Sequence, residues 1–468
     1  MEADEPGQLW RQYIIAGIVN IGMASTGYTI GWTSPAHPIL KNATISPLGV
    51  AVTTDQEAWI GSLLAIGSIF GPFLSGYISS KWGYKWSLIC SGIPLLLGWI
   101  LIVISSTLYI LYAARLFCGL GIGMLFTNSP LYCAEIATVD SRGALGSFLQ
   151  LFNSAGFLPI YFIGSFASYN TIAYVGCSFV AVFCVGMIFM PESPMYHLTK
   201  NDKEAATKCL AKIRGRSPKA VQSELDKMNA EVTTAMARTA TIKTLFQGNN
   251  LKAIFICCML LFFQQFCGID AVLFYLITIF DASGMRLESS IATIIIGIVL
   301  TVASGITSFV VDKYGRRLLL LISTVGTAIS MGLLGMYFTL ADSHVSVVDN
   351  LSFLPILSLV MYIVAFSIGL GPLPWALIGE LLPIEVKNIA SPIPTSLCWI
   401  LMFFVTRFFS PIGEAIGMGP EFFTFGVFSI LAFFFTLLYV PETKGKTFEE
   451  IQDILSGKSS RSQEKSKC

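Results

Sequence analysis

The chain has 468 residues, of which 54% are hydrophobic and 12% are charged. Soluble domains usually carry about 25% charged residues, so this chain has too few to cover a globular surface in water. The composition therefore indicates a protein solvated mostly by lipid, and it excludes a cytosolic enzyme, a nucleic-acid-binding protein and a disordered regulator. The net charge of +1 identifies no partner by itself.

The N-terminus and the cysteines add two exclusions. The first residues, MEADEPGQLWRQ, are acidic and polar, and they lack the basic segment of a secretory signal peptide. The 11 cysteines lie mostly in apolar runs without CxxC spacing, which indicates packing residues and no disulfide framework. The three histidines are scattered, so we expect no metal site.

Apolar runs divide the chain into predicted membrane spans, each of which needs roughly 20 residues. They lie at 12–34, 57–79, 87–106, 109–131, 145–166 and 170–190, and after a gap at 251–280, 288–311, 317–340, 351–379, 391–412 and 422–440. Six spans, a polar stretch and six more spans predict an all-α membrane protein with twelve transmembrane helices.

Basic residues predict the orientation, because they are enriched in cytoplasmic loops. They concentrate after spans two, four, six, eight and ten and in the C-terminal tail, so we expect both termini to be cytoplasmic. Asn42 begins an Asn-Ala-Thr glycosylation acceptor in the long first external loop, which agrees with this orientation.

The predicted spans and the polar stretch between them define the predicted organisation. Its segments are a cytoplasmic tail (1–11), a six-helix half (12–191), a cytoplasmic helical linker (192–250), a second six-helix half (251–440) and a C-terminal tail (441–468). In the linker, Asn201 and Glu204 resemble a capping box, Gly215 ends that helix, and Ser217-Pro218 resembles the start of a second helix. A merely solvated linker is the alternative.

The two halves carry matching motifs at the ends of corresponding spans. A Gly- and Lys-rich motif closes span two at 76–85 and its counterpart closes span eight at 308–317, while Pro-Glu follows spans six and twelve. Glu135 after span four matches Glu380 after span ten. These landmarks indicate a duplicated six-helix unit, an architecture that places transporter substrates near the midplane.

Several motifs together resemble the sugar-porter branch of the major facilitator superfamily over nearly the whole chain. They are Arg115-x-x-x-Gly119-x-Gly121-x-Gly123, Pro130-x-Tyr132-x-x-Glu135, Ser141-Arg142-Gly143, Pro191-Glu192-Ser193-Pro194, Gln264-Gln265-x-x-Gly268-Ile269, Asp312-Lys313-x-Gly315-Arg316-Arg317, Gly371-Pro372-Leu373-Pro374-Trp375 and Pro441-Glu442-Thr443-Lys444-Gly445. Residues 27–35 and 58–62 further resemble insect facilitated trehalose transporters. The resemblance implies the major facilitator fold and sugar transport.

The resemblance also implies roles for particular residues. Amide side chains that would hydrogen-bond a sugar are Gln150, Gln264 and Gln265. Trp375 and Phe366 match aromatics that line the cavity, and Phe274 and Tyr275 match an external lid. The alternatives are interhelical hydrogen bonding for the glutamines and ordinary packing for the phenylalanines. The two glycines and two prolines of 369–375 predict broken backbone within a span, serving as a pivot or a static kink.

Charged residues at the cytoplasmic helix ends form a second predicted site. In the family such residues pair across the halves, and here they are Glu135, Arg142, Glu192, Asp312, Arg316, Arg317 and Glu380. Generic positive-inside charge is the alternative. The first-half copy departs from the family pattern, with Ser80 in place of an acid, Tyr84-Lys85 in place of a basic pair, and Met195 in place of an arginine.

Asp270 stands where the family has a sugar-binding asparagine. A charge inside a span is costly and marks a functional position by default. Three readings stay open: the carboxylate accepts hydrogen bonds from sugar hydroxyls, it titrates or attracts a cation, or it is a protonated group that only bonds between helices.

Other positions of the predicted site are apolar where the family carries amides, namely Leu300, Cys398 and Met402. They leave the sugar unidentified and raise the question whether transport is retained. In span one, Gly27-Tyr28 is followed by Thr29, whereas proton-driven relatives carry an acid there.

The sequence thus predicts a plasma-membrane uniporter for a hexose or trehalose that works by alternating access. A small-molecule sugar and the lipid bilayer are the expected partners, with no cofactor, no enzymatic chemistry, no nucleic acid and no evident obligate protein partner. The alternatives are a proton-coupled sugar symporter, a carrier of a cationic solute, and a sugar receptor that does not transport.

Overall fold

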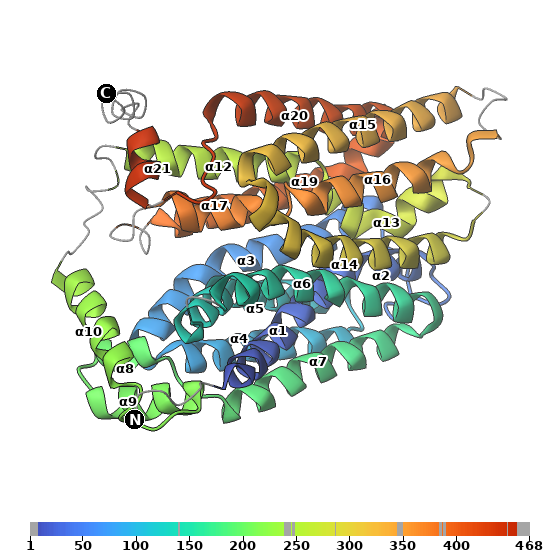
Figure 1. Ribbon diagram of the computed structural model, residues 1–468. Coiled ribbons are helices and arrows are strands. Elements are labelled where there is room, and N and C mark those ends of the chain that lie inside the picture. Colours follow the sequence, from blue (N-terminus) through green and yellow to red (C-terminus); the bar gives the residue numbers. More distant parts are fainter. Residues whose placement is uncertain are drawn as a thin grey trace, which may run out of the picture. The chain divides into compact units, whose positions relative to one another are not determined.

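The structure is a computed structural model that describes residues 8–138, 141–237, 245, 249–285, 287–343, 350–382, 386, 390–446 and 448–455. All regular structure in these residues is helical (Figure 1). The chain forms two compact units, and the first comprises Met1–Trp32, Asn42–Ala51 and Leu63–Thr239. The second comprises Thr33–Lys41, Val52–Ser62 and Ala240–Cys468. Two short segments early in the chain therefore belong to the second unit.

The first unit contains five whole spans and most of a sixth. They are α1 (Leu9–Gly31), the greater part of α3 (Thr54–Trp82), α4 (Tyr84–Val103), α5 (Leu108–Ile136), α6 (Arg142–Phe166) and α7 (Tyr169–Phe189). Helix α1 packs on α6, where Thr26 Oγ1 donates a hydrogen bond to Asn153 Oδ1 at 2.8 Å. Polar contacts of this kind join helices where both faces are otherwise apolar.

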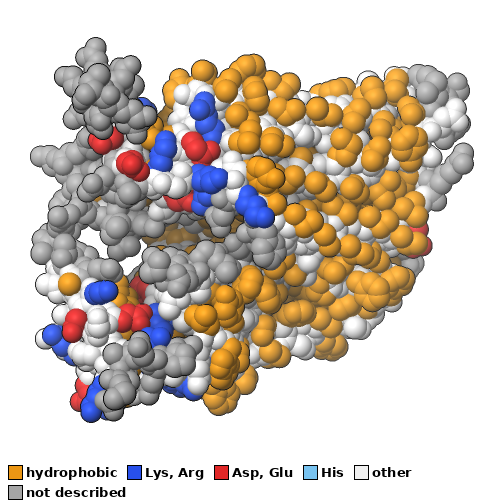
Figure 2. Space-filling model, viewed as in Figure 1, with side chains coloured by type: hydrophobic (Ala, Val, Ile, Leu, Met, Phe, Trp, Pro, Cys, Tyr) orange, Lys and Arg blue, Asp and Glu red, His pale blue; other side chains and the backbone are white. Residues whose placement is uncertain are grey.

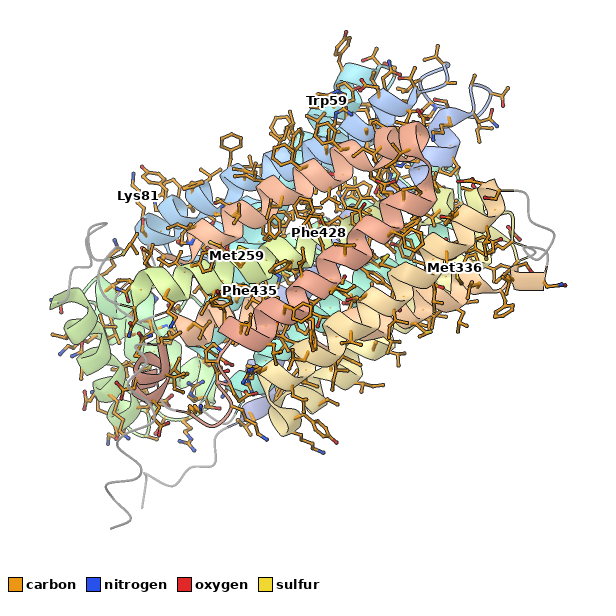
Figure 3. All side chains as sticks on the ribbon, turned by 90° about the horizontal axis from the view of Figure 1, so that it is seen from above. Trp59, Lys81, Met259, Met336, Phe428 and Phe435 are labelled. Carbon is orange, nitrogen blue, oxygen red and sulfur yellow. The ribbon has the colours of Figure 1, made fainter. Side chains whose placement is uncertain are left out.

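The second unit contains the remaining spans, two of which are interrupted. Its helices are α2 (Thr33–Lys41), the first turns of α3, α12 (Asn250–Phe266), α13 (Ile269–Ser283), α14 (Ser289–Tyr314), α15 (Arg316–Asp342), α16 (Leu354–Ile368), α17 (Leu373–Leu381), α19 (Pro392–Ile416), α20 (Met418–Tyr439) and α21 (Phe448–Leu455). Aromatic rings join α12 to α20, with Phe263 and Phe435 5.4 Å apart between centroids. Figure 3 shows Phe428 and Phe435 of α20 near Met259 of α12.

The described helices account for the predicted spans. Eleven, counting the interrupted ones as single spans, are long and apolar enough to cross a membrane. Helix α6 supplies the other predicted span, and its 25 residues extend about 37 Å, more than the ~30 Å hydrocarbon core. The prediction of an all-α membrane protein is confirmed.

Side chains are distributed as a lipid-solvated protein requires. Figure 2 shows apolar side chains along the visible lengths of the helices and Lys, Arg, Asp and Glu at the helix ends. Large apolar side chains point outward from both units, such as Ile93, which is 63% exposed, and Leu438, which is 72% exposed. In water such surfaces would favour aggregation, whereas in a membrane they contact lipid chains.

The linker is helical and folded onto the first unit. It consists of α8 (Pro194–Thr199), α9 (Lys203–Arg214) and α10 (Gln222–Ala237), which share a small apolar core that includes Leu210 and Leu225. Arg214 holds it in place, because Nη1 donates a 2.6 Å hydrogen bond to the Ile136 carbonyl and Nη2 lies 2.7 Å from Glu224 Oε1. The described part of the linker is therefore helical and packed against the first unit.

Two predictions about helix starts in the linker were wrong. Asp202, and not Asn201, caps α9, since its Oδ1 accepts a 3.0 Å hydrogen bond from the Ala205 N–H. Asn201 has a φ of 60°, which directs the chain out of α8. Residues 217–221 form turns, so α10 begins at Gln222 instead of at Ser217-Pro218. The predicted end of α9 at Gly215, with its φ of 64°, is confirmed.

Candidate functional site

The seventh span is interrupted beside the predicted sugar-binding residues. Helix α12 ends just after Gln264 and Gln265, and α13 begins just before Asp270. Between them Gly268 has a φ of 92°, a conformation that L side chains rarely adopt, and an added Cβ would lie 2.7 Å from the Phe425 ring. The glycine therefore turns the chain so that these polar side chains gather at the break.

The tenth span is interrupted as predicted, at 369–372. Gln264 forms hydrogen bonds to the backbone at this second break. Its Nε2 donates hydrogen bonds to the carbonyl oxygens of Leu370 at 2.7 Å and Gly371 at 2.8 Å. Ser323 Oγ accepts the Leu370 N–H at 2.9 Å. Backbone groups freed by a break inside a membrane need such partners. The amide nitrogen of Gln264 thus has a structural role, in line with the interhelical alternative.

Gln265 and Asp270 are buried polar groups with unused hydrogen-bonding capacity. Gln265 Nε2 donates to Cys398 Sγ at 2.9 Å, while its Oε1 has no partner among the described residues. Asp270 is 8% exposed, and its Oδ2 is likewise unpartnered in the described part of the chain. Buried polar atoms without partners are costly. These two oxygens are therefore the atoms best suited to a ligand that donates hydrogen bonds.

Aromatic side chains lie near these acceptors on the second unit. Tyr362 donates to the Cys267 carbonyl at 3.1 Å and stacks on Phe366, with centroids 6.2 Å apart. Phe366 is buried, and Trp375 on α17 is half-buried. The structure brings Gln264, Gln265, Asp270 and Phe366 to the two helix breaks. It places Gln150 on α6 of the first unit, half-buried.

The predicted lid residues are fully buried at a kink in α13. Tyr275 has non-helical φ and ψ angles of −116° and 19°, and its hydroxyl donates to the Thr406 carbonyl at 2.9 Å. Its ring lies 5.0 Å from those of Phe409 and His37. Phe274 and Tyr275 are both 0% exposed. Helix α2 thus packs against α13 beside this kink, within the second unit.

Next to Tyr275 lies an ionic cluster that the sequence analysis missed. His37 Nδ1 is 3.0 Å from Glu57 Oε1, and Lys41 Nζ is 2.6 Å from Glu57 Oε2. Arg407 pairs with Asp55 and stacks over Trp59, with 4.8 Å between the guanidinium carbon and the ring centroid. The available signal in the sequence was Glu57, an acid at the start of a predicted span. Its partners His37 and Lys41 lie on α2, which only the fold brings near.

At the opposite helix ends, the second unit forms a tight charged cluster. Arg316 Nη2 lies 3.1 Å from Glu380 Oε1, and Thr443 Oγ1 donates to Glu380 Oε2 at 2.5 Å. Glu442 accepts the backbone N–H groups of Arg316 at 2.9 Å and Lys444 at 3.0 Å. Burial would raise the pKa of Glu442, but the N–H groups of Lys444, Arg316 and Arg317 outweigh it and lower the pKa.

The first unit forms the corresponding cluster without the arginine. Glu192 accepts the N–H groups of Lys85 at 3.1 Å and Ser193 at 2.9 Å, and Ser193 Oγ donates to Glu135. Tyr84 occupies the position that corresponds to Arg316. Burial raises the pKa of Glu192, because here the N–H groups offset only part of its effect. In both copies a glutamate therefore accepts backbone N–H groups at the start of the next helix. The copies differ because the second unit adds the positive charge of Arg316, where the first unit has Tyr84.

Four other predicted residues complete the comparison with the sequence. The side chains of Arg142 and Asp312 lie outside the described residues, so their roles stay predictions. Arg317 Nη2 donates to the Leu437 carbonyl at 2.5 Å within the second unit. Asn42 is exposed just beyond α2, and its Oδ1 accepts the Thr44 hydroxyl at 2.6 Å.

Comparisons with known proteins give a consistent result. The family model described as "Sugar (and other) transporter" matches residues 15–455. The chain is 32% identical to a facilitated trehalose transporter of Bombyx mori, over 97% of this chain and 88% of that one. It is 30% identical to one of Apis mellifera ligustica, over 97% and 89%.

Solved structures show the same fold. The proton:xylose symporter XylE bound to 6-bromo-6-deoxy-D-glucose matches with a TM-score of 0.78 at 25% identity, covering 95% of this chain and 99% of that chain. A partially occluded, inward-open structure of XylE from E. coli matches with a TM-score of 0.79 at 24% identity, covering 94% and 100%. The predicted major facilitator fold is confirmed.

Proposed function

The chain belongs to the sugar transporter family and is a multi-pass membrane protein, and from this premise we propose that it is a facilitative carrier for a hexose or trehalose. Family membership makes it a transporter and not an enzyme. The relatives in Bombyx mori and Apis mellifera ligustica are named facilitated trehalose transporters, which supports the substrate class and the uniport mode.

The observation that carries the uniport proposal is the absence of an acidic residue from the first span. Helix α1 contains no acidic residue from Leu9 to Gly31. Thr29, where proton-driven relatives carry an acid, is buried, and its Oγ1 accepts the Trp99 Nε1–H at 3.2 Å. This position therefore has no group that changes charge with proton binding.

We propose that the sugar is bound at the two helix breaks of the second unit. Gln265 Oε1 and the Asp270 carboxylate would accept hydrogen bonds from sugar hydroxyls, and Phe366 and Trp375 would pack on the ring. Gln150 on the first unit is proposed as a further amide. Movement of the breaks would then expose the bound sugar alternately to each side of the membrane. We place both chain ends in the cytoplasm and the protein in the plasma membrane.

Reconstitution into liposomes tests the proposal. Radiolabelled glucose and trehalose are expected to equilibrate across the membrane without a proton gradient and to compete with unlabelled sugar. Sugar that binds to the detergent-purified protein but does not cross the liposome membrane would identify a receptor and refute the carrier.

Asp270 favours a second candidate, a proton-coupled symporter. It is a buried carboxylate without an ion-pair partner in the described residues, and the structural relative XylE is named a proton:xylose symporter. The same liposomes distinguish the two: accumulation of sugar above equilibrium when a pH gradient is imposed supports the symporter and contradicts uniport.

A further inference from the structure

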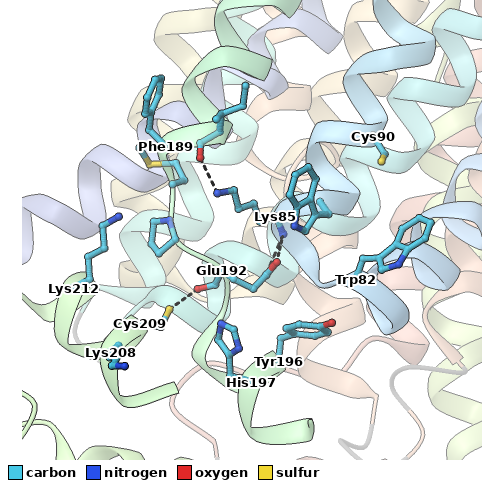
Figure 4. Close-up of a pocket in the computed structure, with 14 residues that line it drawn as sticks. Trp82, Lys85, Cys90, Phe189, Glu192, Tyr196, His197, Lys208, Cys209 and Lys212 are labelled. Atoms are coloured by element: carbon cyan, nitrogen blue, oxygen red, sulfur yellow. Dashed lines mark hydrogen bonds between the residues drawn. The ribbon is translucent and has the colours of Figure 1, made fainter. Parts of the chain in front are cut away.

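A pocket of about 1130 Å³ lies in the first unit, and none of the residues that line it belongs to the proposed sugar site. Its wall is formed on one side by the ends of membrane-spanning helices α3, α4 and α7, and on the other by linker helices α8 and α9 (Figure 4). The pocket therefore opens at the boundary between membrane and water, on the side where the basic helix ends gather.

The polar part of the pocket is positively charged. Lys85, Lys208 and Lys212 line it, together with His197. The Lys85 ammonium donates to the Ile188 carbonyl at 2.7 Å, and Lys208 pairs with the exposed Glu204 on its own helix. Lys212 has no side-chain partner among the described residues and is exposed.

The one carboxylate in the lining does not neutralise these lysines. Both oxygens of Glu192 accept the Lys85 backbone N–H at 3.1 Å, and Oε1 also accepts that of Ser193. Figure 4 shows Glu192 turned toward the backbone of Lys85, while Lys208 and Lys212 extend from α9. Among the described residues, the Lys212 ammonium thus remains available to an anion, and Lys208 can exchange its exposed pair with Glu204 for one.

The rim of the pocket is aromatic and lies exposed on the surface of the first unit. Trp82 is 49%, Trp86 54% and Phe189 69% exposed. Tryptophan is enriched at the headgroup level of membranes, because its ring is amphipathic. A water-soluble anion would need no such rim.

An apolar track continues from the rim into the membrane. Ile93 lies two turns beyond Trp86 on the same face of α4 and is 63% exposed, and Val185 lies one turn from Phe189 on α7 and is 55% exposed. The pocket therefore joins a basic site to surfaces that an acyl chain can follow.

From this arrangement we propose that the pocket binds the headgroup of an anionic phospholipid from the leaflet facing the basic helix ends. The phosphate and any further acidic group of the headgroup contact Lys208 and Lys212, the aromatic rim surrounds the glycerol region, and the acyl chains lie along α4 and α7. Basic pockets beside membrane helices bind anionic headgroups in this way.

The test titrates the full-length, detergent-purified protein with phosphatidylserine and phosphatidylcholine and counts bound lipids by native mass spectrometry. The variant replaces both linker lysines (Lys208→Gln and Lys212→Gln), which are exposed and tolerate the change. Lys203→Gln is the matched control, because Lys203 is also exposed on α9 but lies on the opposite face from Lys212.

We expect phosphatidylserine to bind more tightly than phosphatidylcholine and the double variant to lose about 25-fold in affinity, roughly fivefold per lysine. The control is expected to bind as the wild type does. Equal binding by the double variant and the control would overturn the proposal. So would displacement of the lipid by millimolar inorganic phosphate, which would assign the pocket to soluble phosphate compounds. The readout is lipid binding, so it is independent of whether the protein carries sugar.

Discussion

Asp270 combines a buried carboxylate with an oxygen that has no partner among the described residues, at a helix start that adjoins Gln265. An isolated charge inside a membrane span is retained where it has a function. The amide nitrogens of Gln264 and Gln265 already have protein partners, whereas the carboxylate does not use its full capacity as an acceptor. At the scale of single residues, the acceptor side of the proposed sugar site is therefore concentrated on Asp270 and on Gln265 Oε1.

Asp270→Asn should weaken sugar binding while leaving the fold intact. Asparagine keeps the size but replaces a charge-assisted acceptor, worth about 1.5–3 kcal/mol, with a neutral one, worth about 0.5–1.5 kcal/mol. We expect a roughly tenfold increase in the KM of uptake into liposomes and no change in its pH profile. The matched control is Asp281→Asn, an exposed position on the same helix, which should leave the KM unchanged.

A flattened pH profile in the Asp270→Asn variant would instead show that the carboxylate titrates during transport, in favour of the symporter. Unchanged KM and unchanged pH profile together would remove Asp270 from the site.

At the scale of helices, the proposed sugar site depends on the two helix breaks more than on the positions of the spans. The sequence predicted the spans to within a few residues, because apolar runs and their charged punctuation are local signals. It also predicted the break at 369–372 from its glycines and prolines. The break at Gly268 was missed, since a single glycine between apolar runs is common, and neither its φ of 92° nor its closeness to Phe425 has a local signal in the sequence.

The ionic cluster next to Tyr275 was missed for a related reason. His37, Glu57 and Arg407 are far apart along the chain, and the resemblance to a family assigned them no role. Their contacts exist because α2 and the first turns of α3 belong to the second unit, a division that no local pattern in the sequence predicts.

Gly268→Ala should disturb the proposed site. The left-handed conformation costs an alanine about 1–2 kcal/mol, and the new Cβ would lie 2.7 Å from the Phe425 ring. We expect a lower Tm in detergent and a loss of sugar uptake. The control is Gly332→Ala in α15, where nothing lies within 4 Å of an added Cβ and alanine favours the helix by about 0.8–1 kcal/mol. Equal Tm values for the two variants would contradict the requirement for glycine at 268.

The two clusters at the basic helix ends should respond oppositely to pH. The pKa of Glu442 is lowered from 4.5, so its contribution to stability is present above that pH and is lost as the pH falls through the lowered value. The pKa of Glu192 is raised from 4.5, so its contribution is present below that pH and is lost as the pH rises through the raised value.

Glutamine substitutions test this asymmetry. At pH 8, Glu442→Gln should lower the Tm, because it removes a favoured carboxylate that accepts several N–H groups. Glu192→Gln should leave the Tm unchanged or raise it, because glutamine resembles the protonated form that the first unit favours. Thermal melts at pH 5 and pH 8 measure both, and similar decreases for the two variants at pH 8 would refute the difference.

At the scale of the whole molecule, the two halves share one architecture but differ in their polar and charged residues. The second unit holds the two interrupted spans, the acceptors without partners in the described part of the chain, and the Arg316–Glu380 pair at its helix ends. The first unit lacks that arginine and instead presents the linker and the basic pocket. Under the two proposals, the second unit contributes most sugar contacts, while the first unit bears the linker and the lipid pocket.

If the protein is a carrier that alternates between two states, sugar on one side should accelerate sugar leaving from the other. A loaded carrier returns with its ligand, whereas a pore conducts each molecule independently, because only a carrier couples binding to a shift between conformations. Liposomes loaded with radiolabelled sugar should release it severalfold faster into buffer that contains unlabelled sugar than into buffer without it. The Gly268→Ala variant should lose this acceleration together with net flux. Release that is equally fast in both buffers would contradict alternating access.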